Sequence, residues 1–177
     1  MLVRAAQVED VPAVVAIYGE AVRTSVATFD IADPPAQYWV DKIASADSGD
    51  HFLVANSVSG RVLGFAYSSA YRARPAYAGT RETTIYLAAG SRGQRIGSAL
   101  YEHLLTLMAA DGVHLAVAVV ALPNPASVAL HSSLGFVEVG TMHEVGFKFG
   151  RWVDTLWLER PMTTYDVRQA TVSLLRR

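Results

Sequence analysis

The sequence predicts a single α/β domain built around a mixed β-sheet. Strand-like and helix-like segments follow one another in the order β-α-α-β-β-β-α-β-α-β-β. Hydrophobic residues make up 51% of the 177 residues, which is enough for one sizeable core. No internal repeat, low-complexity tract or linker divides the chain, so one domain is expected.

The N-terminal region is expected to contain a short strand and a helix. Residues 2–5 read as the strand, and apolar residues from Val11 to Tyr18 then recur at helical spacing. Asp10 can cap this helix, and Pro12 suits its first turn. Residues 21–33 show no regular pattern, so we expect a loop there.

A second helix and three strands should follow. The helix is expected over residues 36–46, after a Pro-Pro pair. Residues 52–55 and 62–67 alternate apolar side chains around a Ser-Gly turn, which predicts a hairpin. Residues 81–87 form the next predicted strand.

The second half of the chain begins with a helix over residues 96–110, which Asp111-Gly112 ends. Residues 115–121 are continuously apolar, as in a strand buried on both faces. A short helix is expected over 125–133, with late strands over 136–140 and 147–158. The apolar face of the long helix is predicted from Ile96, Ala99, Leu100, His103, Leu104, Leu107 and Met108.

The stretch YLAAGSRGQRIGS, residues 86–98, lies between a predicted strand and this long helix. Its turn contains Gly90 and Gly93, and it directs backbone N–H groups and a helix N-terminus at one point. Free N–H donors and the positive end of the helix dipole favour an anion there. Arg92 and Arg95 add positive charge, so a phosphate or pyrophosphate is the expected ligand.

Two common phosphate-binding classes do not fit this loop. It lacks the Lys-Ser/Thr ending of a P-loop, and it lacks Gly-x-Gly-x-x-Gly directly after a strand. A glycine-rich connector with solvated arginines remains the alternative.

Composition excludes further classes. The formal net charge is −1, which offers no electrostatic basis for binding nucleic acid or an anionic membrane. The chain has no cysteine, its histidines show no ligand spacing, and no metal site is expected. No apolar run reaches the ~20 residues of a membrane span, and no signal peptide is recognisable, so a cytoplasmic location is expected. Charged residues are only 18%, which suggests that a partner chain covers some surface.

Two motifs together resemble the GNAT family of N-acetyltransferases. The family's acetyl-CoA loop reads Gln/Arg-x-x-Gly-x-Gly/Ala; here Arg92 fills the first position, Gly97 the last, and Arg95 replaces the middle glycine. If that backbone needs a positive φ, an arginine there is strained. The second motif is Asn124-Pro-Ala-Ser127, followed by His131 and Leu-Gly-Phe.

Further segments are similar to the phosphinothricin/methionine sulfoximine acetyltransferase subfamily: Thr28-Phe29-Asp30 and residues 71–77, 82–86 and 146–154. The resemblance covers residues 1–162 and leaves 163–177 as a C-terminal tail of unknown role. It implies a mixed, mostly antiparallel sheet flanked by helices, acetyl-CoA as cosubstrate and a homodimer.

The resemblance implies two catalytic residues. Glu82 would take the proton of the acceptor amine, because a carboxylate in a partly buried strand can have a raised pKa. The alternatives for Glu82 are an ion pair with Arg81 or Arg74, or a solvated position. His131 would assist the leaving thiolate; its alternative is a polar helix residue beside the core.

Cofactor contacts are implied along one strand, the loop and the second motif. In the family a bulge in the strand frees a backbone amide, which would serve as the oxyanion donor near Tyr86 or Leu87. Asn124 would hydrogen-bond the pantetheine arm, or would act only as a loop cap. The implied contacts are Ile85, Tyr86, Leu87, Arg92, Gly93, Gln94, Arg95, Ile96, Gly97, Ser98, Asn124 and Ser127.

The acceptor is expected to be a small amino acid or analogue, such as phosphinothricin, methionine sulfoximine or methionine sulfone. A guanidinium fork suits its carboxylate or phosphinate, although simple surface charge is the alternative for these cations. The implied substrate residues are Phe29, Arg72, Arg74, Thr83 and Lys148. Two other functions stay open: acetylation of a peptide, protein or polyamine amine, and a non-catalytic acyl-CoA-binding module.

Overall fold

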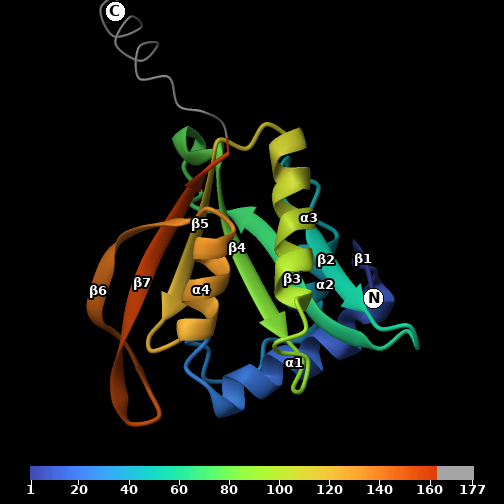
Figure 1. The fold of residues 1–177 in the computed structure, drawn as a ribbon, viewed down its shortest axis with the longest axis horizontal. Helices are drawn as coiled ribbons and strands as arrows, with labels where there is room; N and C mark the ends of the chain where they lie inside the picture. The colour runs from blue at the N-terminus through green and yellow to red at the C-terminus, as the bar shows by residue number, and fades with distance from the viewer. Residues whose placement is uncertain (163–177) are drawn as a thin grey trace, which may run out of the picture.

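The fold is an α/β sandwich with one sheet and helices on both faces (Figure 1). The computed structural model describes residues 1–162. Its helices and strands are β1 (Leu2–Ala5), η1 (Val8–Asp10), α1 (Val11–Thr24), α2 (Ala36–Ile43), β2 (Phe52–Asn56), β3 (Val62–Ala70), η2 (Pro75–Tyr77), β4 (Thr80–Leu87), α3 (Ile96–Ala110), β5 (Leu115–Ala121), α4 (Pro125–Ser133), β6 (Val137–Lys148) and β7 (Arg151–Pro161). The predicted tail, 163–177, lies outside the described residues.

The sheet has seven strands in the order β1-β2-β3-β4-β5-β7-β6. Every neighbouring pair is antiparallel except β4 and β5. The predicted mixed, mostly antiparallel sheet is therefore confirmed. The single parallel pair is joined by α3, as a parallel crossover requires.

Two hydrophobic clusters fill the space on the two faces of the sheet. Leu100, Leu104 and Met108 of α3 are fully buried on one face, and α4 packs against the same cluster. Trp39 of α2 and Val14 of α1 lie in the cluster on the other face, with Phe65 of β3. In Figure 1, α3 and α4 cover the near face of the sheet, and α1 and α2 lie behind it.

The β4–β5 pair separates soon after it forms. The two strands pair only at Thr80↔Leu115, Arg81↔Ala116 and Glu82↔Val117. Beyond Glu82, β4 continues to Leu87 and β5 to Ala121 without pairing to each other. The middle of the sheet therefore has an open seam that begins at Glu82.

The structure corrects several predicted element boundaries. Helix α1 continues to Thr24, into the range expected to be a loop. Asp10 makes no side-chain cap bond to α1, because its carboxylate binds the Arg4 guanidinium at 2.7 Å and 2.8 Å. The first late strand is longer than expected, because β6 runs to Lys148 through two irregularities. The second is shifted along the chain, since β7 spans Arg151–Pro161 and not 147–158.

The predicted buried face of α3 is partly wrong. His103 is exposed, whereas Tyr101 and Leu105 are buried. The buried face of α3 is rotated by about one residue relative to the predicted face. Tyr101 therefore lies toward the open seam.

Candidate active site

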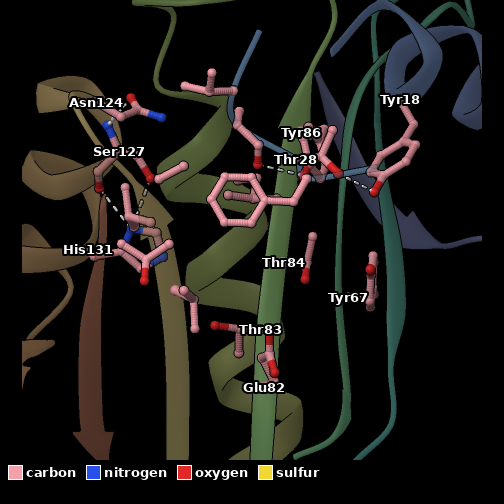
Figure 2. A pocket seen from close by; sticks show the side chains of 18 of the residues that line it. Tyr18, Thr28, Tyr67, Glu82, Thr83, Thr84, Tyr86, Asn124, Ser127 and His131 are labelled. Atoms are coloured by element: carbon pink, nitrogen blue, oxygen red, sulfur yellow. Dashed lines mark hydrogen bonds between the residues drawn. The ribbon is translucent and has the colours of Figure 1, made fainter. Parts of the chain in front are cut away.

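A cavity of about 280 Å³ lies at the open seam. It is lined by residues of both diverging strands, by the loop after α1 and by α4. Figure 2 shows Asn124, Ser127 and His131 on one side, with Glu82, Thr83 and Thr84 along β4. Eight predicted site residues line this cavity: Phe29, Glu82, Thr83, Ile85, Tyr86, Asn124, Ser127 and His131.

The seam leaves backbone N–H groups of β4 free for a ligand. Ala88, just after β4, donates its N–H to the Leu63 carbonyl at 2.9 Å, toward β3. Successive residues of a strand present their N–H groups to alternate sides, so the amides of Leu87 and Ile85 point away from β3 into the seam. The β3–β4 register is unbroken from Gly64↔Leu87 to Ala70↔Arg81. The expected bulge is therefore absent here, and the divergence of β5 frees the amides instead.

The glycine-rich loop continues from β4 into α3 as predicted. Gly90 and Gly93 have a φ of 76°, which glycine adopts without strain. The first helical bond of α3 runs from the Ala99 N–H to the Arg95 carbonyl at 3.1 Å. The N–H groups of residues 96–98 therefore have no acceptor within the helix, as expected for an anion site.

The side chains of this loop divide into two groups. Arg92, Gln94 and Arg95 are exposed, whereas Ile96 and Gly97 are buried in the first turn of α3, with Ser98 half-buried. Ser91 is 1% exposed, and its hydroxyl has no hydrogen-bond partner among residues 1–162. A buried hydroxyl without a partner in such a loop is consistent with a ligand that supplies one.

Arg95 adopts the left-handed conformation that glycine holds at low cost. Its φ is 59° and its ψ is 13°. A residue with a Cβ there is strained by about 1 kcal/mol. The departure from the family pattern at Arg95 therefore costs backbone energy, as the sequence indicated.

Glu82 is half-buried at the closed end of the seam. Burial raises the pKa of its carboxyl, and the positive charges of Lys42 and Arg72 act in the opposite direction. Arg81 is instead paired with Asp50 at 3.0 Å, and no ion pair of Glu82 occurs within residues 1–162. The ion-pair alternative for Glu82 is therefore wrong, and its carboxylate is available to the cavity.

His131 is 3% exposed and is held on both ring nitrogens. Its Nδ1 lies 2.7 Å from the Ser127 carbonyl oxygen, which can only accept, so Nδ1 carries the proton. Its Nε2 lies 2.8 Å from the Tyr101 hydroxyl and accepts from it. Burial lowers the pKa of His131, and the bond to Ser127 partly offsets this. The imidazole is therefore neutral near pH 7.

Tyr101 extends this network to β4. Its hydroxyl also lies 3.3 Å from Thr83 Oγ1, and Thr83 Oγ1 donates to the Val117 carbonyl at 3.2 Å. Tyr101 lines the cavity, yet it was not among the predicted site residues. The signal that could have found it is its position near the start of the helix after the loop, on the face toward the second motif.

Asn124 is the N-cap of α4. Its Oδ1 accepts from the Ser127 N–H at 3.2 Å, so the predicted cap is confirmed. The cap uses only the oxygen of the side chain, and the amide NH₂ remains a donor beside the cavity. The cap role of Asn124 is therefore compatible with the expected hydrogen bond to the pantetheine arm.

The predicted substrate residues fall into two groups. Phe29 and Thr83 line the cavity, whereas Arg72, Arg74 and Lys148 do not. Arg72 and Arg74 are exposed between β3 and β4. Lys148 is 4% exposed, and its ammonium donates to the Thr28 carbonyl at 2.8 Å.

An open seam beside a loop with free N–H groups suits an extended ligand that carries an anionic group. Residues 3–157 match the acetyltransferase (GNAT) domain. The chain belongs to the GNAT family of acetyltransferases, which confirms the resemblance seen in its two motifs.

Known relatives place the chain more narrowly within this family. A phosphinothricin N-acetyltransferase of Streptomyces coelicolor is 42% identical, over 87% of this chain and 92% of the relative. An L-methionine sulfoximine/L-methionine sulfone acetyltransferase of Pseudomonas paraeruginosa is 37% identical, over 89% and 92%. The crystal structure of a phosphinothricin acetyltransferase from Sinorhizobium meliloti, in complex with acetyl-CoA, has a TM-score of 0.86 at 37% identity, covering 90% of this chain and 87% of that one.

Residues 1–162 contain neither a candidate membrane span nor a candidate metal cluster. No helix there is both long and apolar enough to cross a membrane. No cluster of three or more His, Cys, Asp or Glu side chains could hold a metal ion in that range.

Proposed function

We propose that this protein transfers the acetyl group of acetyl-CoA to the α-amine of a small amino acid analogue, such as phosphinothricin, methionine sulfoximine or methionine sulfone. The relatives that carry these substrate names support the acceptor class. The observation that carries the proposal is Glu82: a half-buried carboxylate with no ion-pair partner among residues 1–162, at the point where β4 and β5 part.

The loop and the seam fit acetyl-CoA. The free N–H groups at the start of α3 can bind phosphate oxygens. The amides of Ile85 and Leu87 can pair with an extended amide-containing chain in the seam, as one strand pairs with another. When bound, acetyl-CoA supplies an activated acetyl thioester.

The residues of this chain then have separate tasks. Glu82 removes a proton from the acceptor amine, directly or through a water molecule, because only the neutral amine is a nucleophile. A seam-facing N–H of β4 stabilises the oxyanion. The chain contains no cysteine, so no acyl-cysteine intermediate can form, and direct attack in a ternary complex is the proposed route.

The proposed role of His131 involves Tyr101. The neutral imidazole has its proton on Nδ1, which faces Ser127, and no proton on Nε2, which faces the Tyr101 hydroxyl. We propose that these two side chains, which both line the cavity, act as a unit that gives the departing thiolate a polar site.

We also propose a homodimer formed through the β6–β7 hairpin. Strand β6 is the edge of the sheet, and its hairpin exposes apolar side chains to an unusual extent. Val139 is 62% exposed, Phe147 59% and Trp152 58%. A second copy of the chain would cover this face and close the sheet edge.

The test combines an acceptor panel with a Glu82→Gln variant. CoA release is measured with acetyl-CoA and methionine sulfone, methionine sulfoximine, phosphinothricin, free amino acids, spermidine or a peptide. Turnover confined to the three analogues supports the proposal, and turnover with spermidine or the peptide instead overturns the acceptor class. Glu82→Gln should keep CoA affinity and lose about 10²–10⁴-fold in turnover. Glu138→Gln, an exposed carboxylate on β6, is the matched control. CoA binding without turnover of any acceptor would indicate a non-catalytic binding module.

A further inference from the structure

One side of the cavity is formed by a short segment without regular structure, residues 27–30, here called the wall segment. Ala27, Thr28 and Phe29 line the cavity. The segment is held by side chains from α1 and β4 on one side. The Tyr86 hydroxyl donates to the Ala27 carbonyl at 2.9 Å, and the Tyr18 hydroxyl lies 2.7 Å from Thr28 Oγ1 (Figure 2).

The wall segment is also held from a distant part of the chain, strand β6. The Lys148 ammonium, at the end of β6, donates to the Thr28 carbonyl at 2.8 Å across 120 residues of sequence. Asp30, the last residue of the segment, accepts from Tyr18 at 2.7 Å and acts electrostatically on Lys148. The ammonium of Lys148 is therefore engaged with the protein backbone, outside the cavity lining.

Gly146 of β6 lies directly against the Phe29 ring of the wall segment. A Cβ built on Gly146 would lie 2.4 Å from Cε2 of the Phe29 ring, with two more ring atoms within 2.8 Å. Real Cβ atoms essentially never approach that closely, so any side chain at this position must displace the ring by about 1 Å to reach ordinary contact. The φ of Gly146 is outside the positive region, so packing against Phe29, and not backbone conformation, is what excludes a larger residue.

Near the end of β6, residues that face the wall segment alternate with residues that face the outside of the molecule. Gly146 and Lys148 face the wall segment, whereas Val145 and Phe147 are 42% and 59% exposed on the outer face. This is the two-residue period of a strand. The end of β6 therefore has one face against the cavity wall and the other on the outside of the molecule.

We propose that Gly146 is a specificity-determining residue and Lys148 a positioning residue for the acceptor amine. The missing side chain at Gly146 sets how far the Phe29 ring stands from the cavity, and Lys148 fixes the backbone beside that ring. A larger residue at position 146 pushes the ring into the acceptor space and selects shorter acceptors. The inference rests on the proposed acetyl transfer to an amino acid analogue.

The first experiment measures kcat and KM for two acceptors that differ by one methylene, methionine sulfone and S-methylcysteine sulfone. Gly146→Ala should raise the KM for methionine sulfone by about 10-fold and that for the shorter sulfone less, with the KM for acetyl-CoA unchanged. Gly140→Ala is the matched control, because it lies on the same strand and a Cβ there meets nothing within 4 Å. Equal changes for the two acceptors, or no change, overturn the proposal.

A double variant separates this packing effect from general damage to β6. In a Phe29→Leu background the ring is gone, so adding Gly146→Ala should change the KM less than about twofold. If Gly146→Ala causes the same loss in both backgrounds, the Phe29 contact is not the cause and the proposal fails.

The role of Lys148 is tested by acceptor charge. The Lys148→Met substitution keeps an unbranched apolar side chain at this buried position and removes the ammonium group. A positioning role predicts the same fold-loss with methionine sulfone, whose side chain is neutral, and phosphinothricin, whose side chain is anionic. A larger loss with phosphinothricin would show direct contact with the acceptor and overturn this part of the proposal.

Failure of the proposed function gives a different result. In that case the wild-type protein acetylates neither sulfone nor phosphinothricin. The Gly146–Phe29 contact is then measured by unfolding: Gly146→Ala should lower the unfolding free energy more in the Phe29 protein than in the Phe29→Leu background. Absence of this coupling overturns the inference independently of turnover.

Discussion

The Tyr101 hydroxyl lies 2.8 Å from His131 Nε2, on the opposite side of the ring from the nitrogen that binds the Ser127 carbonyl. This pair joins α3 to α4 beneath the cavity. Because the carbonyl can only accept, the arrangement selects one tautomer of the imidazole. Its consequences can be measured without knowledge of the acceptor.

We expect His131 to be neutral and protonated on Nδ1 at pH 6.5. Burial lowers its pKa from the usual value of 6.5, so the ring loses its charge below that pH. Nitrogen-15 NMR of labelled histidines reports both the tautomer and the titration. A proton on Nε2, or a titration above pH 6.5, would contradict this assignment.

Tyr101→Phe should lower the unfolding free energy by about 1–3 kcal/mol, because it leaves the buried Nε2 of His131 without its donor. Tyr101 is fully buried, so solvent cannot replace the hydroxyl without rearrangement. Urea unfolding measures the change. Tyr77→Phe, at a position 40% exposed, is the control and should change stability by less than about 0.5 kcal/mol. Equal effects of the two substitutions would show that the His131 bond is not important for stability.

Glu82→Gln should stabilise the protein at neutral pH. Burial raises the folded-state pKa of Glu82 above its usual value of 4.5, so between these two pKa values the folded state holds more protons than the unfolded state. Wild-type stability therefore decreases as pH rises from 4.5 through the folded pKa, and the penalty persists above it. The glutamine variant lacks this penalty, so its advantage should disappear near pH 4 and below. Thermal unfolding across pH tests this, and a variant less stable at pH 7 than at pH 4, relative to wild type, would contradict it.

Arg95→Gly should change acetyl-CoA affinity by less than about tenfold, or ~1.4 kcal/mol. The Arg95 side chain is exposed to solvent. Its backbone has a φ of 59°, which glycine adopts readily. Relief of strain is partly cancelled by the greater freedom of glycine in the unfolded chain, so stability should change by no more than about 1 kcal/mol. Calorimetric titration with acetyl-CoA measures the affinity. A larger loss would show that the guanidinium holds a phosphate.

The exposed face of the β6–β7 hairpin should mediate dimer formation. We expect the wild-type protein to have the mass of a dimer in light scattering, and a Phe147→Ser/Trp152→Ser double variant to be monomeric. These two rings pack edge to face with centroids 5.2 Å apart, so the double substitution removes one continuous apolar patch. Val58→Ser, 98% exposed in the β2–β3 turn, is the control. A monomeric wild-type protein, or a double variant with unchanged mass, would contradict this interface.

Elements with local end signals were predicted to the residue. The bounds of α3 and α4 agree with those expected, because a glycine-rich turn or an Asn-Pro cap marks where each begins. Strand β5 was predicted equally well, since its seven residues are all apolar and five of them are buried. At α4, the cavity residues Asn124, Ser127 and His131 were predicted, whereas those of α3 and β5 were not: Tyr101, Val119, Val120 and Ala121.

The remaining elements depend on tertiary contacts that no local pattern reveals. The first late strand was expected to end at Gly140, but irregularities at Glu138/Gly140 and Met142/Gly146 let β6 continue, with Glu144 at a φ of 51°. Helix α3 is apolar around much of its circumference, so its buried face was ambiguous and Tyr101 was missed. Lys148 was predicted as a cation near the substrate, and only the three-dimensional fold shows its bond to Thr28.

Because β4 separates from β5, the amide hydrogen-exchange rates along β4 should vary with a two-residue period. Thr84 and Tyr86 present their N–H groups to β3, while Ile85 and Leu87 present theirs to the seam. In the free protein, slow and fast amides should therefore alternate residue by residue along one strand in the centre of a sheet. Saturation with acetyl-CoA should slow the exchange of only the odd-numbered set, so that the strand then exchanges as if it had neighbours on both sides.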